Sequence, residues 1–191
     1  DDSDQIFQNV FDRYSHISTP SGDAIQILAQ NGISDESILH VRGILKSYLN
    51  NKSGSFWGDD KANISNAIAS TNSLIFILNN LSFVDHIDFQ NLLDSGISGE
   101  IITDEEIIIE GEMHYFNSSV LDKSHRKLFQ FIFEHGIQYV MPPFISAIDS
   151  AMNHAILNEI YFPLNELSFS QQRLKYASLG LEIYYGHWGH I

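Results

Sequence analysis

Histidines that follow an acidic residue by three or four positions are the residues of this chain with the clearest chemical potential. On a helix, that spacing brings both side chains to one face, where a carboxylate and an imidazole can share a metal ion. Helical bundles hold pairs of metal ions with carboxylate and histidine side chains arranged in this way. The pairs on predicted helices are Asp12 and His16, Glu36 and His40, and Asp122 and His125.

Counting weakens this metal signal. With 24 acids among 191 residues, nine histidines produce about two such pairs by chance. Four pairs are present when Glu110 and His114 are included, which is a small excess. No cofactor is therefore expected, and a divalent metal is kept as an alternative hypothesis. In that alternative the ligands come from His16, His40, His125, His154, Asp12, Glu36, Asp122 and Glu159.

Two histidines occupy an apolar stripe. His125 and His135 share a predicted helical face with Leu128 and Ile132, so both are expected to point inward. Ten residues separate them, about 15 Å along a helix, which is too far for one metal ion. A buried histidine with a hydrogen-bond partner is the interpretation we favour.

Motifs of common enzyme chemistry are missing from the sequence. It contains no G-x-S-x-G elbow, no Walker loop and no G-x-G-x-x-G phosphate loop. Cysteine is absent, which excludes disulfides, thiolate metal ligands and a cysteine nucleophile. The sequence therefore favours a protein that is not an enzyme.

The charge balance limits the classes of partner. Twenty-four acids against ten bases give a formal net charge of −14. Such a surface gains no counterion-release energy from a polyanion, which argues against nucleic acids and anionic membranes and favours a basic protein partner. The apolar run Leu74–Leu78 is far too short to span a membrane.

The most distinctive local feature is an acidic, isoleucine-rich segment around residues 99–116. It carries six acids and no base between Glu100 and Glu112, and it is expected to form a small β-hairpin, or else one strand plus an edge strand. An acidic sheet edge can bind a partner by strand addition, or it can serve only to prevent aggregation. Aromatic residues in loops and near the C-terminus offer further contacts. The predicted partner-binding residues are Glu105, Glu106, Glu110, Glu112, Phe56, Trp57 and Trp188.

Helical periodicity dominates the rest of the chain. Apolar residues recur every three or four positions, and the segments between them contain capping and turn residues. The segments expected to be helical are 4–16, 21–31, 34–49, 61–80, 83–96, 117–136, 142–162 and 168–186. We expect a mostly α (α+β) fold: one globular domain over residues 1–191, with seven or eight helices, one hairpin and a possible internal boundary in the loop at 50–60.

These features predict an acidic helical protein that binds a basic protein surface, as an inhibitor or immunity protein would. One alternative is a helical metal-dependent enzyme. Another is the helical portion of a secreted toxin or larger assembly. The sequence begins Asp1-Asp2-Ser3-Asp4 without a methionine, and we expect an exported protein, periplasmic or secreted. A cytoplasmic protein is the alternative, because the lack of cysteine fits either compartment.

Overall fold

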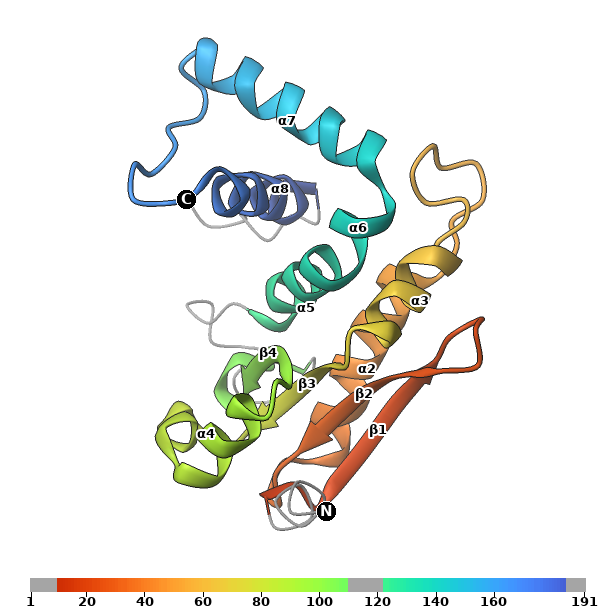
Figure 1. The fold of residues 1–191 in the computed structure, drawn as a ribbon, viewed down its shortest axis with the longest axis vertical. Helices are drawn as coiled ribbons and strands as arrows, with labels where there is room; N and C mark the ends of the chain where they lie inside the picture. Colours follow the sequence, from red (N-terminus) through yellow and green to blue (C-terminus); the bar gives the residue numbers. More distant parts are fainter. Residues whose placement is uncertain (1–9, 110–121, 185–191) are drawn as a thin grey trace.

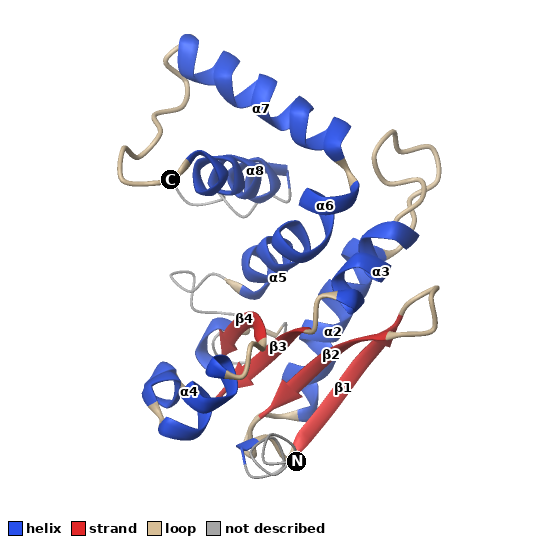
Figure 2. Cartoon of the chain, viewed as in Figure 1, coloured by secondary structure: helices blue, strands red, loops and turns tan. Residues whose placement is uncertain are grey.

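The protein is built on a four-stranded mixed β-sheet with helices on both faces (Figures 1 and 2). The structure is a computed structural model that describes residues 10–109 and 122–184. Strands β1 and β2 are antiparallel, whereas β2, β3 and β4 run parallel, in the spatial order β1-β2-β3-β4. Their bounds are β1 Arg13–Ser18, β2 Ala24–Ala29, β3 Ser73–Leu78 and β4 Ser98–Thr103.

The helices divide between the two faces of the sheet and an outer arm, which consists of α7 and α8. Helices α2, α3 and α5 pack with η3 on one face, and η1 and α4 pack on the other. Helix α8 contacts α5, and α7 contacts α8, on the side away from the sheet (Figure 1). The bounds are α2 Asp35–Leu49, α3 Ala62–Ser70, η1 Leu81–Asp85, α4 Ile87–Asp94, η2 Asp104–Glu106, α5 Ser124–Ile132, η3 Phe133–Ile137 (a π-helix), α6 Gln138–Val140, α7 Pro142–Leu157 and α8 Phe169–Tyr184.

Strand β3 is the centre of the core because every one of its six residues is buried. Ile75 and Ile77 face α2, α3 and α5, while Phe76 packs against Phe11 and Phe89 on the other face. A strand covered on both faces reads as a continuous apolar run without polar alternation. Burial on both faces therefore explains why five of the six residues of β3, in the sequence SLIFIL, are apolar.

The two crossovers pass over opposite faces of the sheet. The chain runs from β2 to β3 through α2 and α3, and from β3 to β4 through η1 and α4. Since the strand order advances in one direction, these crossovers have opposite handedness, and one departs from the usual right hand. The loops after β2 and β3 consequently diverge at the carboxyl end of the sheet.

The expected mostly helical fold is wrong: the fold is α/β. The predicted helix at 61–80 ends at Ser70, Asn72 turns the chain with a φ of 52°, and the apolar run that follows is β3. The predicted helix at 4–16 overlaps strand β1 and the one at 21–31 contains strand β2, and the two strands form an antiparallel pair. Periodicity misled here because a short apolar run fits a buried strand as well as a helix.

The expected hairpin at 99–116 is also wrong. Residues 98–103 form a single strand parallel to β3, and Asp104–Glu106 turn as a 3₁₀ helix. Residues 110–116 lie outside the described part of the chain. Other expectations are confirmed: Ser34 caps a helix over Asp35–Leu49, and Pro142 begins α7.

The loop at 50–60 joins α2 to α3, which both contribute to the same core cluster. In the described ranges 10–109 and 122–184, none of the helices is long and apolar enough to cross a membrane.

Two helical glycines should respond oppositely to alanine. A Cβ at Gly136 would lie 2.8 Å from Ile64 Cγ2 and 2.9 Å from Ile68 Cγ1, whereas a Cβ at Gly43 meets nothing within 4 Å. Gly136→Ala should lower the free energy of unfolding by about 1–3 kcal/mol through overpacking. Gly43→Ala should raise it by about 0.5–1 kcal/mol, because alanine is the better helix former. Urea midpoints measure both changes, and a stabilising Gly136→Ala would contradict the close packing of η3 on α3.

Candidate functional site

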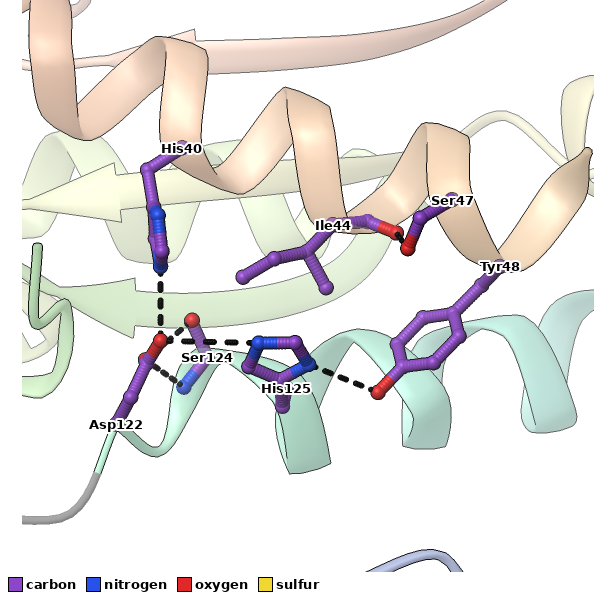
Figure 3. A network of polar contacts seen from close by, with 7 residues as sticks. All are labelled: His40, Ile44, Ser47, Tyr48, Asp122, Ser124 and His125. Atoms are coloured by element: carbon purple, nitrogen blue, oxygen red, sulfur yellow. Dashed lines mark hydrogen bonds and ion pairs between the residues drawn. The ribbon is translucent and has the colours of Figure 1, made fainter. Parts of the chain in front are cut away.

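A polar network joins α2 to the start of α5 (Figure 3). The Asp122 Oδ2 atom lies 2.8 Å from His40 Nε2 and 4.0 Å from His125 Nε2. Tyr48 Oη and His125 Nδ1 are 3.0 Å apart and share a hydrogen bond. The side chains are only 25% exposed at His40, 14% at Asp122 and 25% at His125. The network is therefore largely shielded from water, which strengthens its electrostatic interactions.

Helix geometry on α2 positions one side of this network. His40, Ile44 and Tyr48 are spaced four residues apart, so they lie along one face of α2, and Figure 3 shows that face turned toward α5. Ile44 is buried in the core between the two polar side chains. The apolar packing of α2 thus sets the positions of both polar residues.

Asp122 also organises the first turn of α5. Its Oδ1 atom accepts a hydrogen bond from the Ser124 amide at 3.0 Å and another from the Ser124 hydroxyl. Burial alone would raise the pKa of Asp122, but the hydrogen bonds from His40 and Ser124 outweigh it and hold that pKa below its ordinary value. Asp122 is therefore a carboxylate at neutral pH, bonded to both helices.

The network unites residues from two of the predicted metal pairs and separates the rest. His40 pairs with Asp122, which lies just before α5, while Glu36, one turn before His40 on α2, is exposed. Asp12 and His16 are exposed at β1, and the His16 ring stacks on Tyr14 with centroids 5.5 Å apart. His154 and Glu159 lie at the far end of α7, where His154 Nδ1 is 3.1 Å from Asn158 Nδ2.

No metal-binding arrangement is found in the described residues. In these ranges, no group of three or more His, Asp or Glu side chains has a geometry that could hold an ion. The network instead provides imidazoles bonded to a carboxylate and a phenol, which are groups able to exchange protons. His135 lies elsewhere, where its Nδ1 contacts Ser73 Oγ at 2.8 Å and burial lowers its pKa. A buried, hydrogen-bonded histidine was the expectation for this residue: the hydrogen bond is confirmed, but the side chain is only half-buried.

The predicted partner-binding glutamates differ sharply in environment. Glu105 is exposed on η2. Glu106 is buried, its Oε2 atom lies 2.7 Å from Lys127 Nζ, and it accepts a hydrogen bond from the Thr103 amide at 3.0 Å. Burial opposes the ionisation of Glu106, but Lys127 and Thr103 outweigh it and lower its pKa. The Glu106 carboxylate is thus occupied inside the fold, and Glu110 and Glu112 lie outside the described residues.

The predicted aromatic contacts are placed in part. Phe56 is 87% exposed in the loop between α2 and α3. Trp57 is half-buried and packs against Phe144 of α7, with ring centroids 5.3 Å apart. Trp188 lies outside the described residues.

Sequence reasoning missed a groove between β1 and α2. Its walls come from the edge strand and the first turns of the helix, and two of its apolar side chains are largely exposed: Tyr14 by 57% and Leu39 by 60%. The groove is lined by Asp12, Arg13, Tyr14, Ser15, Asp35, Ile38 and Leu39. Only a correct assignment of β1 as an edge strand could have brought these residues together.

The carboxyl end of the sheet adds acids beside this groove. Ser37 Oγ donates to Asp104 Oδ1 at 3.2 Å, which places η2 against the first turn of α2. Glu36, Asp104 and Glu105 are exposed there. Open α/β sheets commonly bind ligands where successive crossovers leave opposite faces, which here is between β2 and β3. At that point the Asn79 backbone amide donates to Gln30 Oε1 at 2.9 Å and joins the loops that follow these two strands.

Comparison with protein-family models, with curated proteins and with solved structures finds no match to this chain.

Asp122→Asn should destabilise the protein by about 1–3 kcal/mol at pH 7, because it removes a charged acceptor bonded to α2 and α5. Since the folded state lowers the pKa of Asp122, its stabilisation is present above the unfolded pKa and is lost as pH falls through the folded value. The difference between Asp122→Asn and wild type should therefore shrink toward pH 3. Urea unfolding at both pH values measures it, and Asp94→Asn, at an exposed site on α4, is the control.

Glu100→Gln should have the opposite effect. Burial, aided by Glu134 and Glu106 and opposed by Lys127, raises the pKa of Glu100 to about 7. The folded state thus favours the protonated acid, and this contribution is lost as pH rises through about 7. Glu100→Gln should stabilise the protein by about 1–3 kcal/mol at pH 8 and change little at pH 4. An equal effect of the exposed-site variant Glu105→Gln would contradict this explanation.

Proposed function

We propose that the protein binds a basic protein surface through an acidic surface at the carboxyl end of the sheet. The observation that carries the proposal is the meeting of exposed acids and exposed apolar side chains at β1, α2 and η2. This surface consists of Asp12, Tyr14, Asp35, Glu36, Leu39, Asp104 and Glu105.

The mixture of side chains is typical of a protein interface. Tyr14 and Leu39 supply apolar area that a partner can bury, and a tyrosine is a frequent anchor because its ring is large and its hydroxyl polar. The surrounding carboxylates form a polar rim that attracts cations and steers their approach. Among the described residues that line the groove, Arg13 is the one base, and its guanidinium pairs with Asp35.

Charge along the chain supports the same conclusion. From residue 62 to residue 122 there are ten acids and no lysine or arginine. The segment that supplies η2 therefore contributes no cation of its own to compete with a partner. A basic surface bound there would pair with the acids of η2 and would also reduce the repulsion among the acids of this segment.

The outer arm favours a second candidate, in which the protein is part of a larger assembly. Three large apolar side chains at the end of α7 are strongly exposed: Leu157 by 83%, Ile160 by 75% and Phe162 by 74%. Single exposed apolar residues are ordinary, but three large ones within residues 157–162 favour an interaction surface. An assembly would bury this end of the arm.

Charge reversal tests the leading proposal. The probe is an immobilised peptide of alternating lysine and leucine, which presents cations and apolar side chains together, with an alternating glutamate and leucine peptide as the negative probe. Glu36→Lys with Glu105→Lys should weaken binding about tenfold or more at 50 mM salt, and wild-type binding should fall steeply toward 500 mM. Biolayer interferometry gives both numbers.

The matched control is Asp85→Lys with Asp94→Lys, which changes the net charge equally but lies on η1 and α4, over the opposite face of the sheet. It should retain most of the binding. Tyr14→Ser should weaken binding to the lysine–leucine peptide but not to an oligolysine of equal charge. Equal losses in both double variants, or binding that ignores salt, would refute a local acidic site.

A further inference from the structure

A cavity of about 320 Å³ lies between α5 and α8, apart from the surfaces considered above. Figure 1 shows α8 stacked across α5 on the side away from the sheet. Three leucines, Leu167, Leu174 and Leu179, supply an apolar lining. A volume of this size accommodates a small organic molecule.

The polar residues named at the cavity are either neutral or positively charged. Arg126 and Gln130 enter from α5, and Gln171, Lys175 and Ser178 enter from α8. Among residues 10–109 and 122–184, no carboxylate lines the cavity, although the chain holds 24 acids and only ten bases. Two of those ten bases therefore meet at one apolar cavity, and their side chains offer hydrogen-bond donors only.

Ser178 provides a second, independent sign of a ligand. The residue is 3% exposed, and its buried hydroxyl has no hydrogen-bond partner within the described part of the chain. A buried hydroxyl without a partner is costly, so native proteins rarely leave one unsatisfied. Because Ser178 lines this cavity, a ligand oxygen bound there would provide the missing acceptor.

The helices that form the cavity are held by specific contacts. Arg173 makes two hydrogen bonds to Asp149, of 2.5 Å and 2.8 Å, which fix α8 against α7. The side-chain amide of Gln172 donates from Nε2 to the Leu167 carbonyl at 2.9 Å and so fixes the segment that leads into α8. Lys175 follows on α8 and makes no ion pair with a carboxylate in residues 10–109 and 122–184.

We propose that this cavity binds a small amphipathic anion, with its acidic head at Arg126, Lys175 and Ser178 and its apolar chain against the leucines. Lysine and arginine select a negative head group, and the hydroxyl donates to one of its oxygens. The leucine lining excludes simple hydrophilic anions as good ligands, because they would leave the apolar space unfilled.

The test uses the full chain and four defined probes in calorimetric titrations: octanoate, octyl phosphate, octanol and acetate. One molecule of octanoate or octyl phosphate should bind saturably, and the comparison shows whether the site prefers a carboxylate or a phosphate head group. Octanol, which lacks charge, and acetate, which lacks a chain, should each bind at least about tenfold more weakly. Octanol binding as tightly as octanoate, or no saturable binding of either anion, would overturn the proposal.

Two variants separate a binding role from a structural one. Lys175→Met keeps the aliphatic stem and should weaken octanoate about tenfold, whereas Lys46→Met, at an exposed site on α2, should not. Ser178→Ala should also weaken binding, yet raise the urea midpoint of the free protein, because it removes the unpaired hydroxyl. Octanoate affinity unchanged in both cavity variants would place the ligand elsewhere and refute the assignment.

Discussion

The burial of β3 on both faces is the constraint on which the rest of the structure depends. A six-residue strand with no exposed side chain needs an apolar layer on each side, and the chain supplies these layers from α2, α3 and α5 on one face and from η1 and α4 on the other. Covering both faces forces the connections before and after β3 to cross opposite sides of the sheet. The crossovers consequently differ in handedness, which is an unusual feature for successive parallel strands.

The same constraint places the polar residues. Helix α2 must turn its apolar residues toward the sheet, which leaves His40 and Tyr48 beside α5 and its first turn exposed at the carboxyl end of the strands. Asp122 then bonds both helices at once. The polar network between them is thus a consequence of the packing of two amphipathic helices on one sheet face, and its members need not be close in sequence.

Sequence reasoning succeeded where one element carried the signal. The cap at Ser34, the helix that follows it and the start of α7 at Pro142 are local features. It failed at the strands, because the apolar run Leu74–Leu78 and the segments that form β1 and β2 have too few residues for periodicity to distinguish strand from helix. For the same reason the groove at Tyr14 and Leu39 could not be foreseen. The spacing paired His125 correctly with Asp122, which lies 4.0 Å away. It paired His40 with Glu36, its neighbour on the helix, whereas His40 bonds Asp122 from a distant part of the chain.

Net charge alone describes this protein poorly, as three nearby glutamates show. Glu100 lies half-buried on β4, where burial raises its pKa to about 7. Glu106 is buried but ionised, because Lys127 and the Thr103 amide compensate for the lost water. Glu105, between them in sequence, faces solvent. The strand and the 3₁₀ turn determine which carboxylate meets which environment, so identical side chains become a proton-binding group, an internal ion pair and a surface charge. Only the last kind can attract a basic partner, and the acidic surface is accordingly smaller and more local than a charge of −14 implies.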